Sequence, residues 1–341
     1  MPDIDAALPQ STDQVLSVRE LTKSFRVSGG KTLRALDGIN LDLARGETLG
    51  LVGESGCGKS TLARTLMMLE RPDSGSVTFD GIDPFALKGK DLLAFRRRVQ
   101  MVFQDPYASL NSRMTAAEII AEPWRTHKTL YTSRADRDMR VRGLLDLVGL
   151  GAKAFGKYPQ EFSGGQRQRI GIARALALNP EVIICDEPVS ALDLSVQAQV
   201  LNLLNDLQQE LKISYVFISH DLSVVRHVAD RVAVMYLGRI IENGPTEAVF
   251  DRASHHYTSA LMSAAPKLRD EQRGERILLK GEVPSPLNPP SGCRFRTRCA
   301  AATEICAEQR PPRSLDVLVP GHAAECHHPR IDEQQSALSN A

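Results

Sequence analysis

The sequence lacks long apolar runs and carries almost no net charge. No stretch of its 341 residues approaches the roughly 20 consecutive apolar residues that a membrane-spanning helix needs. Residues 1–5 also lack the basic and apolar regions of a signal peptide. We therefore expect a cytosolic chain that at most docks on a membrane through partners. The net charge of +1 gives no general attraction to nucleic acid, and the length allows about two domains.

Cysteine is scarce, with six residues, and in a reducing compartment these are not expected to form disulfides. Two of them, Cys57 and Cys185, lie within motifs described in the next paragraphs, and each is interpreted as a small residue that fits its position. The other four lie close together near the C-terminus.

A complete phosphate-binding loop is present at residues 53–61, which read Gly-Glu-Ser-Gly-Cys-Gly-Lys-Ser-Thr. An apolar strand is predicted before it at 47–52, and a helix is predicted to begin near Lys59. Glycines let backbone amides close round phosphates, the lysine supplies positive charge, and the Ser60 hydroxyl suits magnesium. The chain is thus predicted to bind a nucleoside triphosphate through Gly53, Ser55, Gly56, Cys57, Gly58, Lys59, Ser60 and Thr61.

A second helix start is predicted at Ser163, Gly164, Gly165 and Gln166, before an apolar-periodic run at 170–178. Small residues at a helix N-terminus let the backbone and the helix dipole face an anion. Taken alone, this segment would be a plain serine-capped helix.

Two carboxylates follow a buried strand predicted at 182–186. Asp186 is placed to hold the magnesium shell, and Glu187 to orient or deprotonate the attacking water. Another apolar strand, 215–218, is followed closely by His220, which could contact the γ-phosphate or its water. By itself, His220 would be better interpreted as a solvated loop histidine.

In this order the motifs resemble those of the ATP-binding cassette (ABC) ATPases, over residues 15–253. The resemblance implies ATP and Mg²⁺ as ligands, with magnesium held through Ser60, Gln104 and Asp186. It also implies roles for the motif residues: Walker A at 53–61, the coupling glutamine Gln104, the signature at 163–166, the Walker B pair Asp186 and Glu187, the D-loop residue Asp193 and the switch histidine His220. Phe25 is the candidate for stacking on adenine, with an edge-strand core residue as the alternative.

The expected fold is an α/β P-loop NTPase core. Alternating strands and helices on both sides of residues 105–180 indicate a parallel sheet. Within 105–180 the pattern is helical, at 116–121, 137–148 and 167–178, which predicts an inserted helical subdomain. The expected organisation is a flexible N-terminus at 1–14, the nucleotide-binding domain at 15–253, a C-terminal extension at 254–330 and a flexible tail at 331–341.

The extension contains a proline-rich stretch and four cysteines: Cys293, Cys299, Cys306 and Cys326. In a reducing compartment four close cysteines indicate a metal site, because thiolates suit both zinc and iron–sulfur clusters. The spacing lacks the CxxC pairs usual in zinc ribbons, but His327 and His328 are also available as ligands. Zinc and iron–sulfur therefore both stay open on the spacing alone.

Segments 104–111, 255–261 and 284–299 resemble the ATPase subunits of bacterial oligopeptide and dipeptide importers, and most closely the second, F-type subunit. This resemblance implies a [4Fe–4S] cluster on the four cysteines. It also implies a second ABC ATPase chain as heterodimer partner, two membrane permeases and an extracytoplasmic solute-binding protein. Such a chain sits peripherally on the cytoplasmic face of the membrane and binds no nucleic acid.

Two alternatives to peptide import stay open. Related importers carry nickel chelates, glutathione or sugars, and the chain itself does not select the cargo. ABC ATPases that act on DNA or ribosomes share the motifs, but they carry long coiled coils, zinc modules within the cassette, or a second cassette. None of these is present in this sequence.

Overall fold

The computed structural model describes residues 13–27, 29–264, 277–279, 281–316 and 319–330. Most of the predicted flexible N-terminus, and the predicted tail at 331–341, lie outside the described residues. The chain divides into two compact units, one made of residues 1–83 and 220–341 and the other of residues 84–219. This division follows different boundaries from the predicted domains, which stay a prediction.

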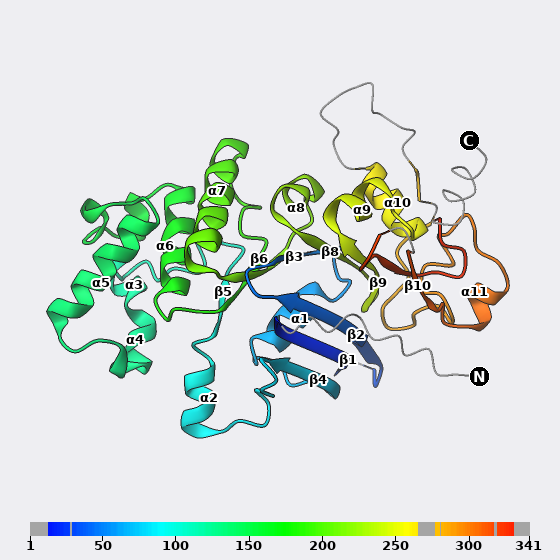
Figure 1. Ribbon diagram of the computed structural model, residues 1–341, viewed down its shortest axis with the longest axis horizontal. Coiled ribbons are helices and arrows are strands. Elements are labelled where there is room, and N and C mark those ends of the chain that lie inside the picture. Colours follow the sequence, from blue (N-terminus) through cyan, green and yellow to red (C-terminus); the bar gives the residue numbers. More distant parts are fainter. Residues whose placement is uncertain (1–12, 28, 265–276, 280, 317–318, 331–341) are drawn as a thin grey trace. The chain divides into compact units, whose positions relative to one another are not determined.

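The first unit contains an antiparallel three-stranded sheet in the order β2-β1-β4, drawn in blue (β1, β2) and teal (β4) in Figure 1. Its long strands β1 (Gln14–Arg26) and β2 (Thr32–Ala44) pair along most of their length, and β4 (Ser74–Phe79) pairs with β1. Leu16, Val18 and Leu21 of β1 are fully buried, so this sheet contributes one face to the core of the unit.

The second sheet of this unit has the order β10-β11-β9-β8-β3. Only β3 (Thr48–Val52) and β8 (Arg231–Tyr236) run parallel, whereas β9 (Arg239–Pro245), β11 (Ala323–Glu325) and β10 (Arg313–Leu315) are antiparallel to their neighbours. The prediction of a parallel sheet is therefore confirmed for β3 and β8, but the unit also contains the antiparallel strands β9, β11 and β10, which were not predicted. The cause is the two-residue turn Leu237–Gly238, in which both residues have positive φ and reverse the chain directly into β9.

Helices of the first unit follow the predicted pattern near the motifs. The loop after β3 leads into α1, which begins at Lys59 as predicted. The remaining helices come from the C-terminal part of the chain (Figure 1). The bounds are α1 (Lys59–Leu66), α8 (Leu222–Val228), α9 (Thr246–Asp251), α10 (His256–Ser263) and α11 (Ile305–Glu308).

The second unit contains the parallel strands that were predicted. Its strands β7 (Ser214–Ile218), β6 (Val182–Asp186) and β5 (Val99–Val102) lie side by side in that order. All residues of β7 and all but the last of β6 are buried, as expected of central parallel strands.

Helices make up all the regular structure between β5 and β6 in the described chain. Trp124 fixes two parts of this stretch together, because its buried Nε1 donates to Ala177 O at 2.7 Å. The helices of the unit are α2 (Gly89–Phe95), α3 (Ala116–Ile120), α4 (Glu122–Thr126), α5 (Arg134–Leu147), α6 (Gly164–Leu176) and α7 (Leu194–Leu211), with short 3₁₀ turns at Lys128–Leu130, Ala152–Ala154 and Pro159–Glu161.

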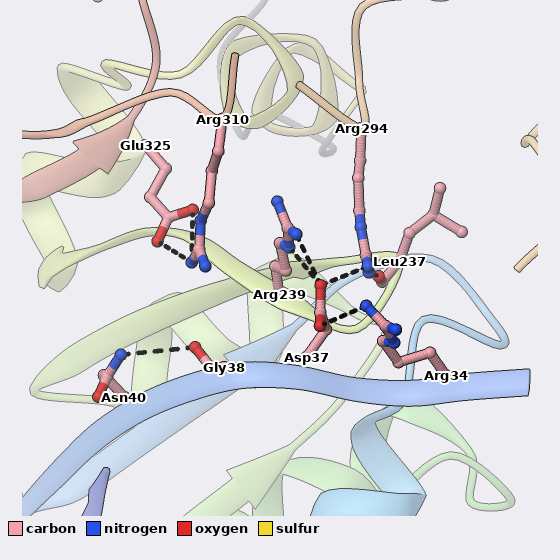
Figure 2. A network of polar contacts seen from close by, with 9 residues as sticks. All are labelled: Arg34, Asp37, Gly38, Asn40, Leu237, Arg239, Arg294, Arg310 and Glu325. Carbon is pink, nitrogen blue, oxygen red and sulfur yellow. Dashed lines mark hydrogen bonds and ion pairs between the residues drawn. The ribbon is translucent and has the colours of Figure 1, made fainter. Parts of the chain in front are cut away.

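Residues 281–316 and 319–330, here called the C-terminal segment, join the first unit through β11 and through charged side chains. Figure 2 shows Asp37 of β2 surrounded by arginines. Its Oδ2 accepts from Arg239 Nε at 2.8 Å and from Arg294 Nη2 at 2.5 Å, and Arg34 lies 3.3 Å from Oδ1. Burial alone would raise the pKa of Asp37, but the hydrogen bond from Arg239 and the neighbouring arginine charges lower it.

No helix within the described ranges is long and apolar enough to cross a bilayer.

Candidate functional site

The phosphate-binding loop connects β3 to α1, and two of its glycines cannot be replaced without a clash. Gly53 has φ +154°, and a Cβ there would lie 2.2 Å from Met235 O. Gly58 caps α1 with φ +113°, and a Cβ would lie 2.4 Å from Ala35 O. The loop therefore passes close to neighbouring backbone, which only glycine permits.

Lys59 lies folded against its own loop. Its Nζ donates to Gly53 O at 2.7 Å and to Glu54 O at 3.1 Å, and the residue is 8% exposed. Ser55 and Ser60 are exposed on the same loop. The lysine can exchange these carbonyls for the phosphate oxygens of a nucleotide, as a phosphate loop requires.

Cys57 is buried within the loop, with 4% of its surface exposed. Burial raises the pKa of its thiol, although Lys59 opposes this, so the group stays protonated. Cys185 in β6 is fully buried and its pKa is also raised by burial. Both cysteines therefore behave as small packing residues.

Glu54 of the loop is not among the site residues predicted from the sequence. Its carboxylate pairs with both terminal nitrogens of Arg298, at 2.8 and 3.1 Å, and its backbone N–H donates to Tyr257 Oη at 3.1 Å. Both partners come from beyond residue 253. An acidic side chain beside an anion site was the only signal in the sequence that pointed to such a partner.

Phe25 and His220 also belong to the first unit. Phe25 is a half-buried residue of β1, and Lys23 Nζ lies 5.3 Å from its ring centroid. His220 is exposed and directly precedes Asp221, which caps α8 by accepting from Ser223 N at 2.9 Å. Nothing in these surroundings tests the predicted roles of the two residues, which stay predictions.

The second unit brings Gln104 and Glu187 together. Gln104 Nε2 donates to Glu187 Oε2 at 2.7 Å, and Asp186 is the last residue of β6. Glu187 has φ +48°, and its N–H donates to Ile218 O at 2.9 Å. A left-handed glutamate costs roughly 1–3 kcal/mol, and such strain occurs preferentially at functional sites. Two carboxylates and an amide at one strand end can hold magnesium and orient a water.

The predicted signature begins α6. Ser163 caps the helix in a reciprocal arrangement, because Gln166 N donates to Ser163 Oγ at 3.4 Å and Ser163 N donates to Gln166 Oε1 at 3.1 Å. Gly165 is needed for packing, since a Cβ there would lie 2.2 Å from Val196 Cγ1. Val196 belongs to α7, which Asp193 caps by accepting from Val196 N at 3.0 Å. The signature and Asp193 therefore lie on packed helix starts.

The four cysteines of the C-terminal segment are near one another but do not form a closed ligand set. The pKa of Cys326 is raised to about 12, chiefly by burial and in smaller part by the neighbouring Cys293, Cys299 and Cys306. Cys293 N also donates to Cys306 O at 2.8 Å. Across the part of the chain that the structure describes, no group of three or more His, Cys, Asp or Glu side chains is arranged to hold a metal ion. The predicted iron–sulfur or zinc centre is therefore not confirmed.

Comparison with known proteins gives two family matches. A family model described as ABC transporter matches residues 36–190. A second, described as oligopeptide/dipeptide transporter, C-terminal region, matches residues 241–306. The two matches together span the phosphate loop, the carboxylate pair and part of the C-terminal segment.

Individual relatives agree with these matches. The putative oligopeptide transport ATP-binding protein YkfD of Bacillus subtilis is 53% identical, over 92% of this chain and 95% of the relative. The dipeptide transport ATP-binding protein DppF of Haemophilus influenzae is 52% identical, over 92% of this chain and 96% of the relative. Among solved structures, the dimeric ATP-binding cassette MJ0796 bound to ADP and Pi is 31% identical with a TM-score of 0.61, over 68% of this chain and 98% of that chain. The chain therefore belongs to the ATP-hydrolysing subunits of ABC transporters, within the oligopeptide/dipeptide transporter family.

Proposed function

We propose that this chain is the F-type ATPase subunit of a bacterial importer and powers the uptake of dipeptides and oligopeptides across the cytoplasmic membrane. The observation that carries this proposal is the match of residues 241–306 to the C-terminal region of oligopeptide/dipeptide transporters, because this region extends beyond a minimal cassette. Relatives at 51–52% identity include the oligopeptide protein AppF and the dipeptide protein DppF.

The nucleotide chemistry is assigned to the residues predicted from the motifs. Lys59 and the loop amides bind the phosphates, while Ser60, Gln104 and Asp186 hold Mg²⁺. Glu187 acts as the general base toward water, and its hydrogen bond from Gln104 supports a role for that glutamine in sensing the site. Phe25 stacks on adenine, and His220 contacts the γ-phosphate.

The proposed partners are those that the resemblance to peptide importers implies. A second ABC ATPase completes the nucleotide sites, with the signature at 163–166 and Asp193 closing over the nucleotide of the other chain. Two permeases and an extracytoplasmic solute-binding protein carry the peptide, and the chain is held peripherally on the cytoplasmic face of the membrane. We assign residues 15–253 to the nucleotide-binding domain, with its helical subdomain at about 105–180, and residues 254–330 to the extension.

The four cysteines of the extension are proposed as ligands of a structural [4Fe–4S] cluster, with zinc as the alternative. Support comes from the donor type and from the proximity of the cysteines, since Cys293, Cys299 and Cys306 all lie near enough to Cys326 to raise its pKa. Such a centre would order a segment in which few apolar side chains are buried. Anaerobically purified protein should contain about four irons per chain and absorb near 400 nm. Stoichiometric zinc without iron would assign the zinc alternative instead.

The decisive test of the function is ATP hydrolysis in the complex assembled with permeases, partner ATPase and solute-binding protein. We expect peptide to stimulate hydrolysis, and Glu187→Gln to slow it by about 100-fold or more while ATP still binds. Glu210→Gln, an exposed glutamate of α7, is the matched control and should leave the rate unchanged. Stimulation by another solute, with none by peptides, would overturn the assigned cargo.

A further inference from the structure

The C-terminal segment reaches the phosphate loop through an aromatic cluster. Phe295 is 2% exposed, and its ring centroid lies 5.5 Å from that of Tyr236 and 5.4 Å from that of Tyr257. The two tyrosine rings lie 4.7 Å apart. Tyr236 ends β8 and Tyr257 belongs to α10, so the cluster holds the segment beside the loop that follows β3.

Arg298 extends from this anchor to Glu54. Its side chain is 7% exposed, and both terminal nitrogens bond the carboxylate, at 2.8 and 3.1 Å. Nη1 also lies 3.4 Å from Tyr236 Oη. Two-point pairing between a guanidinium and a carboxylate fixes orientation as well as distance, and here it joins residues 244 positions apart.

Every polar group of Glu54 is engaged. Its carboxylate bonds Arg298, its N–H bonds Tyr257, and its carbonyl accepts from Lys59 Nζ. Glu54 therefore links the C-terminal segment directly to Lys59, the lysine assigned to bind the phosphates. Its negative charge also lies on the loop that receives a polyanion, where an unmatched carboxylate would oppose binding.

We propose that Arg298 is a positioning residue for the phosphate loop: it neutralises Glu54 and fixes the position of the loop for ATP, so that the C-terminal segment influences nucleotide affinity. This inference rests on the assignment of residues 53–61 as the ATP site. It assigns to the extension a task within the ATPase cycle in addition to any metal it binds. Loss of order in the segment would release Glu54 and weaken ATP binding.

The test measures ATP affinity of the full-length chain by titration with a fluorescent ATP analogue, together with KM and kcat in the assembled complex. Arg298→Gln should weaken binding and raise KM by roughly tenfold, as expected for one uncompensated charge near the phosphates. Its kcat should stay within about twofold, because Arg298 touches no reacting atom. Arg298→Lys should recover part of the affinity.

A double variant, Glu54→Gln combined with Arg298→Gln, distinguishes this positioning role from a purely structural one. Adding Glu54→Gln to Arg298→Gln removes the unmatched charge, so the double variant should regain affinity to within about threefold of the wild type. A structural role would instead leave the double variant as weak as the single variant or weaker. If Arg298→Gln does not fold, Arg298→Met, which keeps the apolar stem but not the charge, provides the same comparison with and without Glu54→Gln.

Arg310→Gln is the matched control. Arg310 also belongs to the C-terminal segment, but it pairs with Glu325 at 3.0 Å and not with Glu54 (Figure 2). It should leave both Kd and KM unchanged. A wild-type chain that fails to bind ATP would contradict the ATPase assignment itself. Normal ATP binding by the wild type and an equal affinity for Arg298→Gln would overturn this inference alone.

Discussion

The phosphate loop and the C-terminal segment belong to one compact unit but are fixed by different kinds of interaction. All five residues of β3 are buried, and the loop after it is shaped by glycines at positions where other residues would clash. The segment instead has strands of three residues and is joined by ion pairs, among them Arg294 to Asp37, which are 257 positions apart. The loop is therefore shaped by close packing against the backbone of β8 and β2, whereas the segment is attached largely through charged side chains.

Among variants that distinguish the two regions, Phe295→Ala is expected to have the largest effect on stability. Removing a fully buried aromatic side chain costs about 3–5 kcal/mol, and here the loss falls on the cluster that anchors the segment. Hydrogen exchange should show lost protection in residues 293–309, while β3 keeps its protection. Leu315→Ala, at a 52% exposed apolar residue of the same segment, is the control. Equal loss of protection in β3 would show that the two regions are not separately stabilised.

Gly53→Ala should disrupt the phosphate loop itself rather than the C-terminal segment. The added Cβ would lie 2.2 Å from Met235 O, so we expect a loss of about 2–4 kcal/mol in the free energy of unfolding and a loss of ATP binding. Gly46→Ala is the control, because that glycine has φ +68° but no atom within 4 Å of the added Cβ. It should cost only the left-handed strain, roughly 1–2 kcal/mol. Equal effects of the two variants in urea unfolding would exclude the steric explanation.

Asp37→Asn tests the charged attachment of the segment. Asp37 is 13% exposed at its side chain and is shared by Arg239 and Arg294, so we expect a loss of about 2–3 kcal/mol in stability. Arg226 is also shared by two oppositely charged residues, Glu247 and Asp251, but its side chain is exposed. Arg226→Gln should therefore lower the free energy of unfolding by less than about 1 kcal/mol. Denaturant unfolding of both variants measures the difference. A smaller loss for Asp37→Asn than for Arg226→Gln would contradict the role of burial.

The smallest expected effect is a dependence of stability on pH, through His322. His322 is fully buried between Glu242, at 2.8 Å, and Asp316, at 3.3 Å, and Arg252 lies 3.7 Å from that aspartate. Burial alone would lower the pKa of His322, but the hydrogen bonds and charges of Glu242 and Asp316 raise it. Its charged form therefore adds stability that is complete below the unfolded pKa of 6.5 and is lost as the pH rises through the higher folded pKa.

Thermal melts between about pH 6 and pH 9 should show this decline, and His322→Gln should flatten it. His227→Gln, at an exposed histidine of α8, is the control and should keep the wild-type slope. A decline of unchanged slope in His322→Gln would assign the pH dependence to another group.

The strands and helices around the motifs were predictable because their signals are local. The apolar run at 182–186 became β6, and the serine before Gly164 became the cap of α6. The antiparallel β9 and β11 were not predicted, because pairing depends on a two-residue turn and on residues near the C-terminus. Likewise, the pairing of Glu54 with Arg298 could not be predicted, because the two residues are 244 positions apart and no local sequence pattern connects them.

The most direct test of the central claim is uptake of a labelled peptide into proteoliposomes that contain the complete complex, with ATP on the side of this chain. We expect ATP-dependent accumulation of the peptide, and its abolition by Glu187→Gln with the permeases and solute-binding protein unchanged. ATP hydrolysis by the intact complex without accumulation of any dipeptide or oligopeptide would contradict the account.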